Sequence, residues 1–408
     1  MSGHYDELET RSADQRATDL ARDLPETVAG VQSQASAFAD LLKGVEAGDV
    51  TTREDLAKLP VLRKSALATA QKDAPPFGGF AIRAPHTYKQ IFQSPGPIYE
   101  PGETAHDWWR IARFLHACGI GKGDIVQNCF SYHLTPAGAM FETGSHAMGA
   151  AVVPAGTGQT ELQAQAAAAI GVTAYGGTPD FLKVILESAD EQGLDVSRLT
   201  KAAVSGGALF PSLRQEYTDR GIACRQCYAI ADLGNVAYES EAMEGLIVNE
   251  GLIVEIVTPG TGDPVPEGEV GEVVVTTFNP DYPLVRFATG DLSAVLPGVS
   301  PCGRTNMRIK GWMGRADQTA KVRGMFVRPE QVAALVAHHP EISRARVTVT
   351  RAGERDLMTV QVEAESGDTQ GISESVQSLL KVRGDVEIVK PDSLPKDGIV
   401  IDDQRKYD

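Results

Sequence analysis

The sequence lacks a long hydrophobic run and an excess of basic residues. None of its 408 residues falls in a stretch of about 18 consecutive apolar residues, so we expect no transmembrane helix. The formal net charge of −16 argues against sequence-independent binding of nucleic acid and against adsorption to anionic membranes. Residues 1–20 are polar and contain no apolar signal core, so we expect a cytoplasmic protein.

Cysteine is also scarce. The chain has five cysteines, and this odd number spread over a long sequence favours reduced thiols. Cys224 and Cys227 form a single CxxC pair, and Cys302 is a candidate third metal ligand, but no fourth stands out. Buried, reduced cysteines are the favoured interpretation, and zinc or redox chemistry is the alternative.

The composition is that of a globular protein with a full-sized core, at 42% hydrophobic and 23% charged residues. Between about 105 and 220, helical patterns alternate with short apolar runs such as "DIVQNCF", "AAVVPAG" and "TKAAVSGG". This alternation predicts an α/β fold whose sheet is mostly parallel and has crossover helices.

The pattern of predicted secondary structure changes twice further along the chain. After residue 240, two β runs joined by a Gly/Pro turn indicate an antiparallel part. Beyond 314–318, two helical patterns and several strands indicate a compact α+β domain. We therefore predict a large N-terminal domain over 1–314, with mixed sheets and helices, and a small mobile C-terminal domain over 315–408.

Three glycine-bearing turns follow predicted strands, at 155–161, 175–181 and 205–211. In an open parallel sheet, ligands bind outside the carboxyl ends of the strands, where glycine allows close backbone approach. Glycine also ends many such loops for steric reasons alone. Three such turns together favour a ligand site at this edge.

Asp291, in "RFATGDL", follows a Thr-Gly turn. A carboxylate in this position can accept hydrogen bonds from two vicinal hydroxyls, as acidic residues do on ribose. A solvated turn aspartate is the alternative reading of the motif alone.

The segment "GWMGRADQTAKVRGMFVRPEQV" (311–332) adds specificity to these observations. Together with "RFATGDL", "SGGALFP" and "YAIAD", it resembles the adenylate-forming superfamily, which includes the acyl-CoA synthetases. Four further stretches, "KLPVLRKSAL", "PPFGGF", "VVPAGTGQTELQ" and "GGTPDFLKVI", are similar to phenylacetate-CoA ligases. The resemblance runs from about residue 50 to the end.

The resemblance implies that a carboxylic acid attacks the α-phosphate of ATP and that CoA then displaces AMP. It places Asp291 on the ribose, Arg315 on the ribose or phosphate, and Asp317 at the hinge of the mobile domain. The remaining implied contacts are to adenine (Gly206, Gly207, Ala208), elsewhere on the nucleotide (Ser94, Tyr228), to the acyl group (Tyr132, Gly158), to pantetheine (Gly324) and to Mg²⁺ (Asp232).

The chain departs from the family pattern in three places. The phosphate-loop stretch "SPGPIYEPGE" has prolines at 95, 97 and 101, which remove amide donors, and acidic Glu100 and Glu103 where a polyphosphate would lie. Asp232 replaces a glutamate, and Ile399 stands where relatives have a catalytic lysine. Losing one such donor costs about 10²–10³ in rate. Lys396 and Lys406 are the candidate substitutes.

Two functions remain open at this point. The leading hypothesis is an AMP-forming acid–CoA ligase, acting on a small or aromatic carboxylic acid with ATP, Mg²⁺ and CoA, in a possible homodimer. The alternative is a non-adenylating descendant that binds AMP, an acyl-adenylate or acyl-CoA, either as a regulator or for the thioester half-reaction only.

Overall fold

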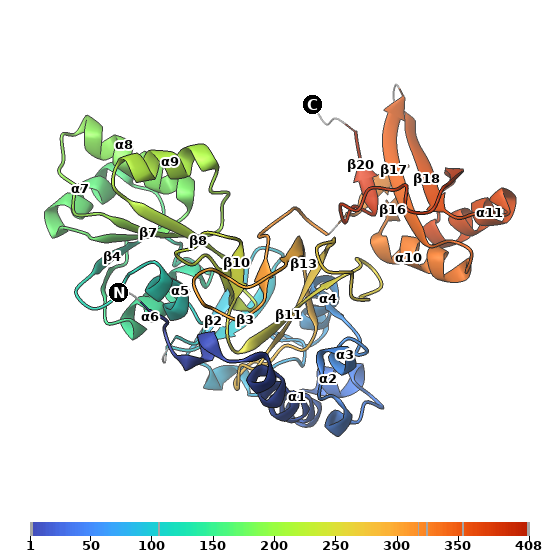
Figure 1. The fold of residues 1–408 in the computed structure, drawn as a ribbon, viewed down its shortest axis with the longest axis horizontal. Coiled ribbons are helices and arrows are strands. Elements are labelled where there is room, and N and C mark those ends of the chain that lie inside the picture. Colours follow the sequence, from blue (N-terminus) through green and yellow to red (C-terminus); the bar gives the residue numbers. More distant parts are fainter. Residues whose placement is uncertain (1–2, 105–106, 317, 324, 353–354, 406–408) are drawn as a thin grey trace. The chain divides into compact units, whose positions relative to one another are not determined.

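The structure is a computed structural model. It describes residues 3–405, except for 105–106, 317, 324 and 353–354 (Figure 1). The chain divides into two compact units. The first comprises residues 1–254, 275–287 and 296–311, and the second comprises 255–274, 288–295 and 312–408. None of the helices described here is both long and apolar enough to span a membrane.

The first unit begins with helices. Ser12 caps the longest of them, and its side chain and that of Gln15 satisfy each other's backbone amides in a capping box. Thr52 caps α3 by accepting a hydrogen bond from the Asp55 amide. The helices of this region are η1 (Glu7–Thr10), α1 (Ala13–Gln34), α2 (Ser36–Leu41), η2 (Ala47–Asp49), α3 (Arg53–Leu56), α4 (Lys64–Asp73) and η3 (Pro85–Thr87).

A parallel sheet forms the centre of this unit, as the sequence predicts. Its strands run in the order β8-β7-β6-β4-β5, and each neighbouring pair is parallel. Antiparallel β9, β10 and β14 continue it beyond β8. The bounds are β4 (Ile125–Asn128), β5 (Ala151–Val153), β6 (Ala174–Gly177), β7 (Lys201–Val204), β8 (Ala223–Ile230), β9 (Gly234–Tyr238), β10 (Leu246–Val248) and β14 (Arg308–Ile309).

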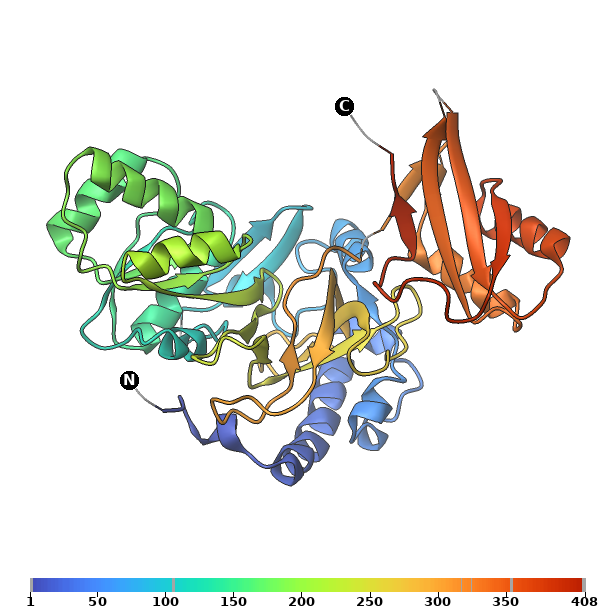
Figure 2. The same ribbon diagram turned by 45° about the horizontal axis from the view of Figure 1, so that its top comes forward.

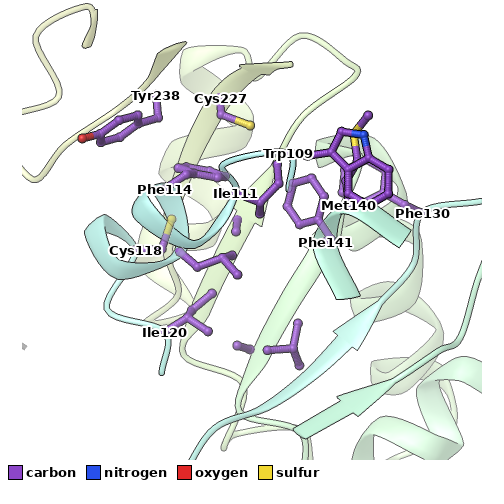
Figure 3. Close-up of a cluster of buried hydrophobic side chains, with 14 of the residues drawn as sticks. Trp109, Ile111, Phe114, Cys118, Ile120, Phe130, Met140, Phe141, Cys227 and Tyr238 are labelled. Carbon is purple, nitrogen blue, oxygen red and sulfur yellow. The ribbon is translucent and has the colours of Figure 1, made fainter. Parts of the chain in front are cut away.

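Helices cover both faces of the parallel sheet. One face carries α5 (Ala112–Ala117) and α6 (Ala137–Ala147), whose Phe114 and Phe141 lie in a buried cluster with Trp109 (Figure 3). The other face carries α7 (Thr160–Ile170), α8 (Pro179–Glu191) and α9 (Pro211–Asp219), which bury their apolar side chains in a second cluster. The result is a three-layer α/β arrangement, the class expected from the sequence.

The proline-containing stretch forms a β-hairpin. Antiparallel β2 (Gln90–Ser94) and β3 (Ile98–Gly102) pair from Gln90 opposite Gly102 to Ser94 opposite Ile98. Pro95 and Pro97 fall in the turn, and the Gly96–Pro97 peptide bond is cis. A short strand, β1 (Leu62–Arg63), precedes α4.

The second unit has its own sheet and core. Its four strands run in the order β19-β18-β17-β20, and α10 (Pro329–His338) and α11 (Thr369–Leu380) cover one face of them (Figure 2). Alternate residues such as Val347 and Val349 point into this core. The four strands are β17 (Arg344–Ala352), β18 (Arg355–Glu363), β19 (Asp385–Val389) and β20 (Ile401–Asp403), and β15 (Ala320–Val322) and β16 (Met325–Val327) form a separate antiparallel pair.

The chain passes between the two units within three strands, β11 (Leu252–Val257), β12 (Val270–Thr277) and β13 (Phe287–Leu296), which are neighbours in that order, and once more between residues 311 and 312. The compact α+β arrangement expected after residue 314 lies within the second unit. The boundary at 314/315 and the mobility of the segment that follows stay predictions.

Candidate active site

Several candidate residues lie in turns at the carboxyl ends of the parallel strands. β7 leads into an exposed turn that contains Gly206, Gly207 and Ala208. Gly206 has a φ of +71°, a conformation that strains other residues. β5 leads into the loop of Gly158, where a Cβ would face open space. These two turns are exposed at the edge of the sheet, whereas Gly176 and Gly177 of the third expected turn are buried within β6.

Tyr132 follows β4 at the same edge. The Asn128 side-chain amide donates a 2.7 Å hydrogen bond to the Tyr132 hydroxyl and a 2.8 Å bond to the Gly138 carbonyl. A Cβ at Gly138 would lie 2.8 Å from the Tyr132 ring, so this glycine lets the ring pack on α6. Burial is the main cause of a raised pKa for Tyr132, which keeps it a neutral phenol. Asn128 and Gly138 are positioning residues that the sequence analysis missed.

Asp232 follows β8, whose half-buried Tyr228 lies just before it. The Asp232 side chain is fully buried, and its Oδ2 accepts a 2.7 Å hydrogen bond from the Lys64 ammonium. Its Oδ1 has no hydrogen-bond partner among the residues that the structure describes. Lys64, the first residue of α4, is a charged partner that the sequence analysis did not assign.

Asp232 can supply one oxygen to a hard cation such as Mg²⁺, which accepts a single carboxylate when phosphates and water provide the other ligands. Oδ1 is the available atom, because Lys64 occupies Oδ2. Within the described part of the chain, no three His, Cys, Asp or Glu residues are grouped to hold a metal. The residues thus fit a cation shared with a bound phosphate.

We expect Lys64→Met to lower the free energy of unfolding by about 2 kcal/mol, because it leaves the Asp232 carboxylate buried without its cation. Lys58→Met is the matched control: Lys58 pairs with Asp55 at 2.9 Å but is 73% exposed, against 28% for Lys64. An exposed pair of this kind contributes less than about 0.5 kcal/mol. Urea denaturation of both variants checks this, and equal losses would contradict it.

Ser94 and Glu100 are diagonal neighbours on the two strands of the β2–β3 hairpin. The Ser94 hydroxyl donates a short hydrogen bond to the Glu100 carboxyl, and both residues are buried. The second Glu100 oxygen, Oε2, has no hydrogen-bond partner among the described residues. The hairpin turn and residues 133–135 line an open pocket of about 500 Å³. The Ser94 hydroxyl is thus engaged within the protein.

Burial and the nearby negative charge of Asp232 raise the pKa of Glu100 to about 8, against the opposing effects of Ser94 and Lys64. Glu100 is therefore protonated near neutral pH. Glu103 is paired with Arg83 at 2.5 Å. The two carboxyls therefore add less negative charge to this stretch than the sequence predicts.

Asp291 and Arg315 are brought together in the second unit. Asp291, in β13, is 7% exposed, and its Oδ1 accepts hydrogen bonds from Arg315 Nη1 at 3.0 Å and Trp312 Nε1 at 3.1 Å. The Arg315 and Trp312 side chains are themselves largely exposed. The arrangement presents a carboxylate, a guanidinium and an indole together, which are groups suited to a ribose phosphate.

The C-terminal candidates lie near the turn before β20. Gln318 holds this turn: its amide donates to the Gly398 carbonyl at 2.8 Å and accepts from the Ile401 amide at 2.8 Å. Lys396 pairs with Glu269 at 3.0 Å, which together with Asp392 raises the pKa of this lysine. Asp317, Gly324 and Lys406 lie outside the described residues.

Cys224 and Cys227 do not form a metal pair. They are three residues apart on β8, so their side chains point to opposite faces of the sheet. Cys227 lies in the cluster of α5 and α6 (Figure 3), and Cys224 lies in the other cluster. The interpretation as buried, free thiols is confirmed for both.

Solved structures share this fold. The structure of 2-hydroxyisobutyryl-CoA ligase in complex with 2-HIB-AMP in the postadenylation state aligns with a TM-score of 0.71 at 23% identity, covering 97% of this chain and 91% of that one. The same enzyme with 2-HIB-AMP and CoA in the thioesterification state gives a TM-score of 0.70 at 23% identity, covering 98% and 92%. This chain therefore shares the fold of these solved structures.

Sequence comparisons agree with the structure. The "AMP-binding enzyme" family model matches residues 135–279. Phenylacetate-coenzyme A ligase of Thermus thermophilus is 28% identical over 390 residues, covering 91% of this chain and 86% of the relative. The enzyme of the same name from Escherichia coli K12 is 29% identical over 381 residues, covering 86% and 85%. The chain is similar to phenylacetate-coenzyme A ligases over most of its length, as its motifs predict.

Proposed function

We propose that the chain is an AMP-forming acid–CoA ligase that activates a small or aromatic carboxylic acid first as acyl-AMP and then as acyl-CoA. The similarity to phenylacetate-coenzyme A ligases along most of the chain carries this proposal. The accessible strand-end turns and the Asp291–Arg315 pair support it, because they suit the nucleoside part of the substrate.

In the adenylation step, the substrate carboxylate attacks the α-phosphate and pyrophosphate leaves. Asp291 would accept hydrogen bonds from the ribose hydroxyls, and Arg315 would donate to the ribose or phosphate. The exposed turn of Gly206, Gly207 and Ala208 would lie against adenine, with Tyr228 nearby. When bound, Mg²⁺ would neutralise phosphate charge, and Asp232 Oδ1 is the oxygen that would hold it.

In the thioester step, the CoA thiol displaces AMP. Asp317 is our candidate for the hinge and Gly324 for the pantetheine tunnel, while Tyr132 and Gly158 would line the acyl pocket. We also propose that the chain forms a homodimer, which its mass in solution would test.

A second candidate function is adenylate or acyl-CoA binding without adenylation. Two observations favour it. Ile399 occupies the position where the family resemblance implies a lysine, while Lys396 is engaged with Glu269. At the hairpin, the Ser94 hydroxyl is engaged with Glu100 instead of being directed to a ligand. Both changes concern the phosphate and adenylation chemistry and leave the Asp291–Arg315 pair in place.

Turnover with ATP, Mg²⁺, CoA and a panel of carboxylic acids including phenylacetate separates the two functions. We expect mass spectrometry to detect an acyl-CoA and an equal amount of AMP. Absence of product from every acid, together with measurable AMP binding, would support the non-adenylating alternative. If preformed acyl-AMP gives acyl-CoA while ATP does not, only the thioester half-reaction is retained.

A further inference from the structure

Cys302 differs from the other four cysteines in its surroundings. It lies half-buried in a turn closed by a 3.0 Å hydrogen bond from the Gly303 amide to the Ser300 carbonyl. Its sulfur is 3.0 Å from the Ser300 hydroxyl. The other cysteines, Cys118, Cys129, Cys224 and Cys227, are buried. Cys302 is therefore the most accessible thiol among the five.

A buried guanidinium lies beside this thiol. Arg304 is 1% exposed; its Nε is 3.2 Å from a Glu9 carboxylate oxygen and its Nη1 is 3.0 Å from a Glu241 oxygen. The third nitrogen, Nη2, is buried and has no hydrogen-bond partner among the described residues. The guanidinium also interacts with the Cys302 sulfur. The site thus places the nucleophilic Cys302 sulfur near the Arg304 guanidinium, whose Nη2 has no acceptor among the described residues.

These neighbours favour the thiolate. Burial alone would raise the pKa of Cys302, but the hydroxyls of Ser240 and Ser300, the Arg304 amide and the positive Arg304 guanidinium lower it below its ordinary value. Burial raises the pKa of Cys129, Cys224 and Cys227 to about 12 and also raises that of Cys118. The thiolate is the reactive form of cysteine, so the five thiols differ in reactivity.

We propose that Cys302 is a modification site, at which a small hydroperoxide oxidises the thiol to a sulfenic acid. The thiolate attacks the distal peroxide oxygen, so that an S–O bond forms and the O–O bond breaks. Hydroxide or alkoxide leaves and takes a proton from water; sulfur is oxidised and the peroxide is reduced. The unused Arg304 Nη2 and the Ser300 hydroxyl are the donors for the new oxygen, which distinguishes this site from an ordinary half-exposed cysteine.

Peroxide treatment of the intact protein followed by dimedone trapping and peptide mass spectrometry tests the proposal. We expect an adduct on Cys302 and none on the four buried cysteines, which serve as internal controls. Ser300→Ala should lower the yield of adduct severalfold while leaving the melting temperature nearly unchanged. No adduct on Cys302, or equal labelling of all five thiols in folded protein, would overturn the proposal.

Alkylation kinetics give a second readout that does not depend on oxidation. The rate of iodoacetamide labelling of Cys302 should have a pH midpoint below 9.0, the ordinary thiol value, and should move toward it in urea. At pH 7 the folded protein should react faster than the unfolded chain, because a larger fraction of Cys302 is thiolate in the folded state. A midpoint at or above 9.0 in the folded protein would overturn the proposal.

Discussion

Replacing Asp291 by alanine should raise the dissociation constant for AMP about a hundredfold. The physical reason is the loss of charged acceptors for two ribose hydroxyls, since hydrogen bonds to a charged group contribute about 1.5–3 kcal/mol each. Asp291 is also the acceptor that holds Arg315 and Trp312, at 3.0 and 3.1 Å. The substitution therefore removes a direct contact and releases the guanidinium beside it. Isothermal titration calorimetry with AMP measures the effect.

Two variants separate the ligand contact from general damage. Asp291→Asn keeps a carbonyl oxygen for the Trp312 indole but removes the charge, so we expect an intermediate loss of about tenfold. Glu365→Ala removes an exposed carboxylate in the second unit and should leave AMP binding unchanged. If Asp291→Ala binds AMP with wild-type affinity, the assignment of the ribose site is wrong, whatever the enzyme's turnover.

The central sheet could be predicted because its signals are local. The buried strands β4 and β7 appear in the sequence as short runs, "DIVQNCF" and "TKAAVSGG", with helical patterns between them. These periodicities depend on neighbouring residues alone, and parallel strands with crossover helices are the ordinary solution for such a pattern. The positions of the candidate turns at one edge follow directly from that topology.

The β2–β3 hairpin was harder to predict from the sequence. Prolines at 95, 97 and 101 suggested a loop that could not donate amides, yet Pro101 lies within β3 opposite Ile91. A sheet of two strands gives each strand one unpaired edge, where a residue without an N–H is tolerated. The sequence alone does not reveal whether the amide of a given residue would face the partner strand or the open edge of the sheet.

The Lys64–Asp232 contact shows why part of the site escaped prediction. The two residues are 168 positions apart, and no periodicity or spacing links the first turn of α4 to the residue after β8. The same applies to Glu100, whose protonation depends on its burial and on Asp232. Residue types at the site could be inferred from the motifs, whereas their charge states required the three-dimensional arrangement.

The Glu100 carboxyl should make the protein less stable as the pH rises from about 5 to 8. Its pKa of about 8 lies above the ordinary value of 4.5, so over this range the folded state holds a proton that the unfolded state has released. The free energy of unfolding then falls by up to about 1.4 kcal/mol per pH unit, and the stability associated with this proton is lost above pH 8. Glutamine cannot ionise, so Glu100→Gln should remove this dependence. Its advantage over wild type should grow to about 3–4 kcal/mol at pH 9.

Urea denaturation of wild type and Glu100→Gln from pH 5 to 9 measures the difference, which cancels the titration of the groups that do not interact with Glu100. Glu103→Gln is the matched control, because its carboxylate follows the same hairpin but is paired with Arg83 at 2.5 Å. This control should lack the gain at high pH. A constant difference between wild type and Glu100→Gln across the range would show that Glu100 is already ionised at pH 5. Glu100 would then present a permanent negative charge beside the phosphate stretch, which would strengthen the case for a protein that binds AMP but not ATP.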